Sequence, residues 1–288
     1  MQTKRLLRRF GLRARKGLGQ HFLINRGVLE LTTSAAELDP FDVVIEVGPG
    51  LGVLTRELAR QVGWLFAIEL DSKLAAILQN NLAPFSNVTV INRDILEINP
   101  VALLSKVPAS LTGLTGNALS YKVVANLPYY ITSPVLRHFL EADVKPRLMV
   151  LMVQKEVAEA ITARAGRMSV LSVSVQFYGR PEIISRMPAA CFYPAPEVDS
   201  AILRVAVYSQ PAVAVADVNG FFSLVRAGFS TARKQLVNSL SQGLKLPKTE
   251  VLPLLQQAKI ASQRRAETLT LEEWAGLWRV FTQLEKRK

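Results

Sequence analysis

Short apolar runs alternate with amphipathic runs through the middle of the chain, and this pattern predicts the elements of the fold. Five runs are short, apolar and mostly rich in β-branched residues, which is typical of buried strands: 43–47, 65–69, 88–91, 122–126 and 148–153. Helical periodicity is found between these runs and before the first of them: 26–38, 52–61, 72–82 and 133–142. We expect Asn25, Ser72 and Ser133 to cap three of these helices. The alternation predicts a parallel sheet covered by helices on both faces.

The later part of the chain predicts the end of this sheet and then a separate helical region. Two further strands, 181–187 and 201–207, are expected to close the sheet as an antiparallel pair. A linker rich in Pro, Ala and Val follows at 209–216, and helical patterns then cover four segments: 218–228, 231–240, 248–257 and 271–284. We interpret 100–120 as an irregular insertion. The expected parts are an N-terminal arm (1–20), a Rossmann-like α/β domain (21–208) and a small all-α domain (209–288).

Basic residues gather at the two ends of the chain. The 288 residues include 35 Lys and Arg against 23 Asp and Glu, which gives a net charge of +12. Residues 1–20 contribute +7, residues 21–208 contribute −1, and residues 209–288 contribute +6. Basic flanks around a neutral body indicate a polyanion as partner, because Lys and Arg displace the counterions held by phosphates. On charge alone, a solvated basic surface without such a partner is an equal alternative.

Composition excludes several other classes of protein. An apolar content of 49% is enough for a packed core, which excludes disorder as the main state. No stretch approaches the ~20 apolar residues that a membrane span requires. The single cysteine, Cys191, excludes an internal disulfide framework, and with only two histidines no His/Cys metal site is expected.

A glycine-rich turn connects the first buried strand to the following helix. Gly48, Gly50 and Gly52 are spaced G-x-G-x-G, which lets the backbone turn tightly and lets a ligand lie against it. Dinucleotide sites have the spacing G-x-G-x-x-G and hold a pyrophosphate. Here Glu46 precedes the turn, and its carboxylate would repel a pyrophosphate but accept hydrogen bonds from an ammonium group. The turn therefore predicts S-adenosylmethionine, which carries an amine and a sulfonium and no phosphate.

Acidic residues also stand at the ends of the next two strands. Glu69 stands 21 residues after Gly48, where a carboxylate can hold both ribose hydroxyls, and Leu70 follows it. Asp94, next to Ile95, comes after the third strand and can accept a hydrogen bond from the exocyclic amine of the cofactor. Ligands of open α/β sheets bind beyond the carboxyl ends of the strands, where all these residues fall. The sheet is therefore predicted to be that of an S-adenosylmethionine-dependent methyltransferase.

The tetrad Asn126-Leu127-Pro128-Tyr129 follows the fourth strand. An exocyclic amine of adenine is a poor nucleophile because its lone pair is delocalised into the ring. The Asn126 side-chain oxygen and the Leu127 carbonyl can each accept one amine hydrogen, which would aim the lone pair at a sulfonium methyl. Pro128 fixes the backbone that presents this carbonyl, and Tyr129 would stack on the base. Taken alone, the tetrad is also an ordinary turn sequence.

Three blocks in this order resemble the KsgA-type ribosomal RNA adenine dimethyltransferases, and the resemblance runs from about residue 16 to about residue 284. They are Gly19-Gln20-His21-Phe22-Leu23, the tetrad, and a late loop that begins at Phe192 and reads FYPAPEVDSA. The resemblance implies S-adenosylmethionine-dependent N6,N6-dimethylation of two adjacent adenosines in a hairpin near the 3′ end of small-subunit rRNA.

The resemblance also implies roles for individual residues. Gln20, His21, Leu23 and Asn25 would line the cofactor and target pocket, together with Asn126. Phe192 would close over the adenine, which must leave its stack to reach the pocket.

The helical region is expected to position the RNA. Arg226, Arg233 and Lys234 lie in one predicted helical stretch, where spacings of three, four and seven residues align side chains on one face. The family usually has a basic pair one residue earlier as well, and Ala232 stands in that place. The expected partners are small-subunit rRNA and the assembling small ribosomal subunit, and we expect a cytoplasmic bacterial enzyme that acts as a monomer.

Two alternatives remain open at this stage. A large-subunit rRNA adenine methylase of the antibiotic-resistance type would share the pocket and the tetrad. A non-catalytic assembly or transcription factor would keep the fold and the affinity for RNA. The block 19–23 and the basic pair 233–234 favour the small-subunit enzyme, and the intact acids and tetrad favour activity.

Overall fold

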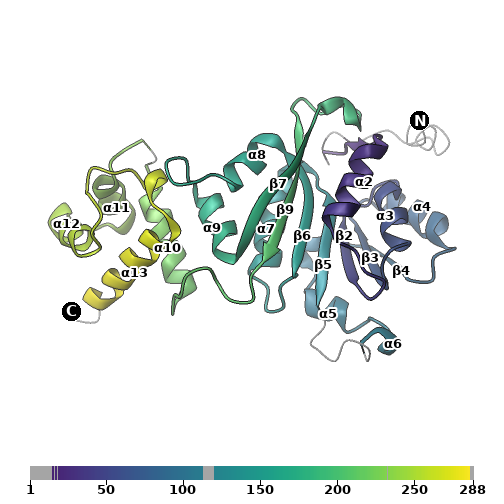
Figure 1. Ribbon diagram of the computed structural model, residues 1–288, viewed down its shortest axis with the longest axis horizontal. Helices are drawn as coiled ribbons and strands as arrows, with labels where there is room; N and C mark the ends of the chain where they lie inside the picture. The colour runs from purple at the N-terminus through teal and green to yellow at the C-terminus, as the bar shows by residue number, and fades with distance from the viewer. Residues whose placement is uncertain (1–14, 16, 18, 113–119, 232, 286–288) are drawn as a thin grey trace. The chain divides into compact units, whose positions relative to one another are not determined.

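The computed structural model describes residues 15, 17, 19–112, 120–231 and 233–285. The chain divides into two compact units (Figure 1). The sheet unit comprises Met1–Ala158 and Pro181–Val207, and the helical unit comprises Glu159–Arg180 and Tyr208–Lys288. The helical unit is thus larger than the range 209–288 expected from the sequence.

A seven-stranded sheet with the order β4-β3-β2-β5-β6-β9-β7 forms the sheet unit. Its strands are β2 (Val43–Val47), β3 (Trp64–Glu69), β4 (Val88–Asn92), β5 (Tyr121–Asn126), β6 (Leu148–Gln154), β7 (Gly179–Met187) and β9 (Ser200–Val207). The first five run parallel, as the alternating pattern predicts, while β9 runs antiparallel to β6 and β7 follows at the edge. The apolar runs are strands because both faces of the central strands are buried.

Helices connect these strands, and their bounds differ slightly from the predicted ones. They are α2 (Arg26–Ala35), α3 (Val53–Ala59), α4 (Ser72–Leu82), α5 (Pro100–Leu104), α6 (Ala109–Thr112), α7 (Thr132–Leu140) and α8 (Lys155–Ile161). Asn25 caps α2 as expected, because its side chain accepts a hydrogen bond from the Val28 amide. The other two predicted caps are wrong. Asp71 caps α4 instead of Ser72, and α7 begins one residue before Ser133 without a side-chain cap. The predicted insertion contains α5 and α6, while residues 113–119 lie outside the described part.

The parallel register places the ends of four strands at one edge. Val47 pairs with Ile68, and Glu69 pairs with Asn92, so β2, β3 and β4 end side by side. β5 also pairs with β2 in parallel, which brings Asn126 to the same edge. The segments that follow these strands therefore converge there.

A buried ion cluster lies near the opposite, amino ends of the strands. Lys122 is 3% exposed, and its Nζ lies 2.7 Å from Asp42 Oδ2. The same ammonium donates to the carbonyls of Ala36 (2.9 Å) and Glu37, and Asp42 also binds Arg147. The cluster lies at the opposite ends of the strands from Glu69 and Asn126, so we assign it to the stability of the fold.

A second, two-stranded sheet joins segments that are distant in sequence. β1 (Phe22–Leu23) pairs with β8 (Phe192–Tyr193) in antiparallel register, with Phe22 opposite Tyr193 and Leu23 opposite Phe192. The Ile24 amide extends the contact by donating to the Cys191 carbonyl at 2.9 Å. The block 19–23, here called the entry block, and the late loop are thereby held together.

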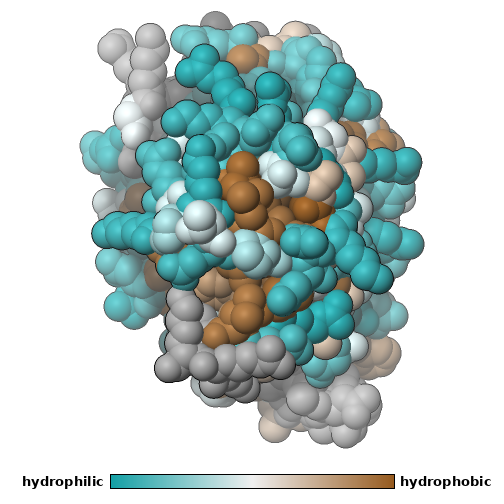
Figure 2. All heavy atoms as spheres, turned by 90° about the vertical axis from the view of Figure 1, so that its left-hand side faces the viewer, coloured by the Kyte–Doolittle hydropathy of each residue, from teal (hydrophilic) through white to brown (hydrophobic). Residues whose placement is uncertain are grey.

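The helical unit consists of α9 (Val170–Tyr178), α10 (Val218–Gly228), α11 (Leu236–Leu244), α12 (Lys248–Gln257) and α13 (Leu271–Glu285). α9 belongs to it because Phe177 stacks on Phe221 at 5.4 Å between ring centroids and meets Phe222 edge to face. The side of the molecule on which α11, α12 and α13 are labelled in Figure 1 is shown in Figure 2, where apolar side chains gather within a hydrophilic surround. No helix in the described ranges is long and apolar enough to cross a membrane.

The prediction of one helix over 231–240 is wrong in its first half. α10 ends at Gly228 and α11 begins only at Leu236. Between them, the Ser230 hydroxyl donates to the Ser239 carbonyl, and the Ser239 hydroxyl donates to the Thr231 carbonyl. Such side-chain hydrogen bonds to the backbone compete with helix formation, and they hold this segment as a turn.

Candidate functional site

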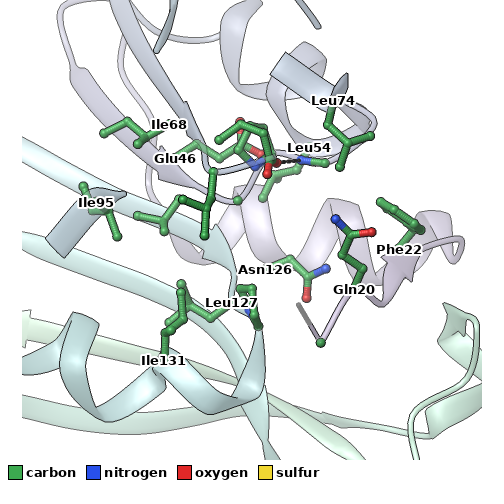
Figure 3. A pocket seen from close by; sticks show the side chains of 18 of the residues that line it. Gln20, Phe22, Glu46, Leu54, Ile68, Leu74, Ile95, Asn126, Leu127 and Ile131 are labelled. Carbon is green, nitrogen blue, oxygen red and sulfur yellow. Dashed lines mark hydrogen bonds between the residues drawn. The ribbon is translucent and has the colours of Figure 1, made fainter. Parts of the chain in front are cut away.

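A cavity of about 280 Å³ lies at the carboxyl edge of β2, β3, β4 and β5 (Figure 3). Its wall includes thirteen of the residues predicted from the sequence: Gln20, His21, Leu23, Glu46, Gly48, Gly50, Glu69, Leu70, Asp94, Ile95, Asn126, Leu127 and Pro128. The entry block, the glycine turn, two strand-end acids and most of the tetrad thus share one cavity.

Glu46 is the most deeply buried acid of the site. Its side chain is 1% exposed, and its Oε2 has no hydrogen-bond partner among the described residues. Burial raises the pKa of the Glu46 carboxyl to about 8; the Thr55 hydroxyl opposes this rise, and the charge of Glu69 adds to it. A buried carboxyl with a free oxygen at a cavity wall is suited to a cationic donor.

Glu69 fixes the glycine turn. Its Oε2 accepts a hydrogen bond from the Gly50 amide at 3.0 Å, and its Oε1 accepts one from the Asp71 amide at 2.9 Å. Burial raises the pKa of Glu69, although these backbone donors oppose the shift. Gly50 has a φ of +59°, and a Cβ at this position would stand 3.1 Å from the Phe22 ring. Glycine is needed here both for the backbone conformation and for the approach of β1.

Asp94 and Asn126 are oriented by hydrogen bonds that leave further acceptor capacity. Asp94 Oδ1 accepts from the Leu96 amide at 2.9 Å, so the residue caps a 3-10 turn over Ile95–Glu97. The Asn126 amide nitrogen donates to the His21 carbonyl at 2.9 Å. This bond uses the nitrogen and leaves the Asn126 side-chain oxygen available to another donor.

His21 and Tyr129 form a stacked pair beside the cavity. Their ring centroids are 5.6 Å apart with an interplanar angle of 23°. The Tyr129 hydroxyl lies 2.6 Å from the hydroxyl of Ser200, which is fully buried, and His21 Nδ1 lies 2.8 Å from the Pro194 carbonyl oxygen. Burial raises the pKa of Tyr129. The late loop thus holds the ring of Tyr129 in place, although Tyr129 itself is outside the set of cavity-lining residues.

Three other predicted residues do not line this cavity. Phe192 is 2% exposed and belongs to the core with Leu23, because its pairing opposite Leu23 turns the ring inward. Asn25 caps α2. Gly52 begins α3 with a φ of +76°, where a Cβ would stand 2.8 Å from Leu78, so its lack of a side chain serves helix packing. These three residues are therefore outside the wall of this cavity, and the contacts predicted for them stay predictions.

Sequence reasoning missed two exposed residues that do line the cavity, Tyr130 and Arg93. Tyr130 directly follows the tetrad, and Arg93 directly precedes Asp94. Both residues are next to predicted site residues in the sequence, and this position could have identified them, because segments that follow parallel strands converge at one edge.

The predicted phosphate-binding residues do not share a helix. Arg226 lies in the last turn of α10, where its Nη2 donates to the Ser223 hydroxyl at 3.0 Å. Arg233 and Lys234 are exposed in the turn before α11. The helical alignment predicted for the three residues is wrong, because the chain leaves the helix after Gly228.

The wall of the cavity fits S-adenosylmethionine. Glu46 offers an unsatisfied buried oxygen to an ammonium group, and the Gly48–Gly50 turn leaves room for a ligand against the backbone. The carboxylates of Glu69 and Asp94 are acceptors for hydroxyl and amine hydrogens. Within the described ranges, no group of three or more His, Cys, Asp or Glu residues could hold a metal ion.

Comparisons with known proteins agree with this site. Residues 11–283 match the family model described as "Ribosomal RNA adenine dimethylase". The chain is 51% identical over 282 residues to "Ribosomal RNA small subunit methyltransferase A" of Dehalococcoides mccartyi, which covers 98% of this chain and 93% of the relative. It is 41% identical over 283 residues to the protein of the same name from Moorella thermoacetica, with 97% and 96% covered.

Two solved structures resemble the fold. The 23S rRNA methyltransferase ErmE has a TM-score of 0.69 and 29% identity, with 91% of this chain and all of that chain covered. A dimethyladenosine transferase from Plasmodium falciparum has a TM-score of 0.75 and 22% identity, with 91% of this chain and 98% of that chain covered. At this identity the comparison shows a similar fold. The family model spans nearly the whole sequence, and the chain therefore belongs to the ribosomal RNA adenine dimethylase family.

Proposed function

We propose that this protein transfers methyl groups from S-adenosylmethionine to N6 of two adjacent adenosines in the hairpin near the 3′ end of small-subunit rRNA. Membership of the ribosomal RNA adenine dimethylase family supports the reaction. The names of relatives that match over nearly their whole length favour the small subunit. The observation that carries the chemistry is the Asn126 amide, whose nitrogen is bound to His21 and whose oxygen is left for a substrate hydrogen.

S-adenosylmethionine, when bound, supplies a methyl group on a positively charged sulfur. We assign Glu46 to its ammonium group, Glu69 to its ribose hydroxyls and Asp94 to its exocyclic amine, since each of these acids lines the cavity. The other residues that we assign to cofactor binding are Gln20, His21, Leu23, Gly48, Gly50, Leu70, Ile95 and Asn126.

The tetrad would activate the target amine by hydrogen bonding rather than by a strong base. The Asn126 oxygen and the Leu127 carbonyl each accept one amine hydrogen, which frees the nitrogen lone pair for attack. The bond from Asn126 to His21 holds the acceptor in position before the substrate arrives. Tyr129 stabilises the charge that develops on the nitrogen, and Ser200 holds its ring. The methylated nitrogen is acidic enough to lose its proton to water.

Contacts to phosphates would position the RNA without choosing a sequence. We assign this role to Arg226, Arg233 and Lys234, since the last two are exposed on the turn before α11. The basic arm would contribute similarly, although most of it lies outside the described residues. We further propose that a monomer acts on the assembling small subunit, in the cytoplasm, where such particles form.

The decisive test is methyl transfer from labelled S-adenosylmethionine to ribosomal subunits that lack the modification, followed by mapping of the label. We expect two dimethylated adenosines in the 3′-terminal hairpin of small-subunit rRNA and no label on large subunits. Label on large-subunit rRNA alone would identify the activity named for ErmE instead. No transfer to either subunit would favour a non-catalytic assembly factor.

A further inference from the structure

Tyr130 is an exposed aromatic residue in the wall of the cofactor cavity. It lies in the 3-10 turn Tyr129–Ile131 that follows the tetrad, and its side chain is 55% exposed. Other exposed aromatic residues in the described ranges, Phe41, Tyr193 and Tyr208, do not line the cavity. Tyr130 is therefore an aromatic ring that a ligand at the cavity can reach.

The two tyrosines of this turn have different surroundings. Tyr129 is half-buried, stacked with His21 and bound through its hydroxyl to Ser200. No aromatic ring in the part of the chain that the structure describes stacks on Tyr130. Gly19 lies close to one edge of the Tyr130 ring, because a Cβ at this position would stand 3.3 Å from its Cδ1. The ring thus has the block 19–23 beside one edge, while more than half of its surface is open to a ligand.

An exposed aromatic ring can stack on a base that has lost its neighbour in the RNA. When one adenosine leaves its stack, the base next to it loses a stacking partner. Aromatic side chains replace such partners in single-stranded RNA sites. Arg93, an exposed cation in the same wall, favours a phosphate-bearing ligand over an apolar one.

We propose that the Tyr130 ring stacks on the base adjacent to the adenosine being methylated. The inference rests on the proposed function, since it requires an RNA in which the target has a neighbour. Because the strand has a direction, the Tyr130 position takes the base on one fixed side of the target. That base is the second adenosine of the pair in one of the two methylations and the base flanking the pair in the other, whereas Asn126 and Tyr129 would contact the reacting adenosine in both.

The test compares variants of Tyr130 on unmodified small subunits, with KM for the subunit and kcat measured separately. Tyr130→Ala and Tyr130→Leu should each raise KM about tenfold, because both lose the aromatic face, while kcat changes less than about twofold. Tyr130→Phe keeps the ring and should behave like the wild type. Phe41→Ala is the matched control, because Phe41 is 54% exposed and lies outside the cavity. Cofactor affinity by calorimetry and thermal unfolding show whether each variant is folded.

The outcomes separate this inference from the proposed function. If the wild type does not methylate small-subunit rRNA, the proposed function fails first. If it does, and Tyr130→Leu has the KM of the wild type, the stacking inference is overturned. A fall in kcat at constant KM would also overturn it, since the ring would then act on the reacting base. Should Tyr130→Ala unfold, the comparison of Tyr130→Leu with Tyr130→Phe decides alone.

Discussion

The buried carboxyl of Glu46 leads to a prediction about cofactor binding. Its pKa is about 8, because burial disfavours the charged form and Glu69 adds a like charge. At pH 7 the free enzyme therefore holds Glu46 mostly protonated. An ammonium group favours the carboxylate, so binding must first release this proton. Since pH 7 is one unit below the pKa, releasing the proton costs about 1.4 kcal/mol. The affinity for the cofactor at pH 7 is therefore about tenfold lower than its limit at high pH.

The perturbation is pH, and the assay is calorimetric titration of S-adenosylmethionine into the free enzyme between pH 5.5 and 7.5. This range stays below the titration of an α-amino group at about 8. A single proton release with a pKa near 8 predicts that affinity rises about 75-fold across the range. At pH 7, titrations in buffers with different ionisation enthalpies should give about 0.9 proton released per cofactor bound.

Glu46→Gln supplies the matched control, because the amide has nearly the same shape and does not titrate. The variant should bind more weakly at pH 7.5 and lose the steep pH dependence. The free wild type should also lose stability as pH rises from about 4.5 to 8, because the folded state keeps a proton that the unfolded chain releases. Glu46→Gln should remove that loss in thermal unfolding. A flat affinity profile for the wild type, with no proton release, would refute the reasoning.

Three further predictions concern other parts of the molecule. Asn126→Ala should lower turnover by roughly 10²–10³-fold while calorimetry still detects cofactor binding, and turnover near the wild-type rate would contradict the hydrogen-bond role. Arg233→Ala with Lys234→Ala should weaken rRNA binding and flatten the plot of log affinity against log salt, so an unchanged slope would exclude phosphate contacts. Asp42→Ala should cost about 3–5 kcal/mol in denaturant unfolding because Lys122 stays buried without a counter-charge, and Asp42→Ala combined with Lys122→Met should recover part of it.

Local patterns predicted the sheet well because burial acts on each strand separately. β2, α4, α10 and α12 begin and end where the pattern placed them, and the acids at the carboxyl ends of β2, β3 and β4 do meet at one cavity. The order of the strands was not predicted: β5 lies beside β2 although β3 and β4 separate the two in sequence, and a local pattern does not record this crossover.

What the sequence could not predict depends on contacts between distant segments. The Phe192 ring is buried because Phe192 pairs with Leu23. Tyr130 lines the cavity in place of the predicted Tyr129, because the hydroxyl of Tyr129 is bound to Ser200. Arg233 and Lys234 left the predicted helix because three hydroxyl groups favoured a turn. Helix periodicity does not record such competing side-chain bonds.

The pairing of β1 with β8 also bears on how the enzyme is made. β1 spans Phe22–Leu23, and its partner strand, Phe192–Tyr193, is synthesised about 170 residues later. The strands β2 to β6 can assemble as they leave the ribosome, but the entry segment has no partner strand until β8 follows. The part of the cavity wall that contains Gln20 and His21 is therefore completed late in synthesis. A nascent chain that ends before β8 would contain Glu46, Glu69 and Asp94, but its Gln20 and His21 would not yet be fixed in the wall.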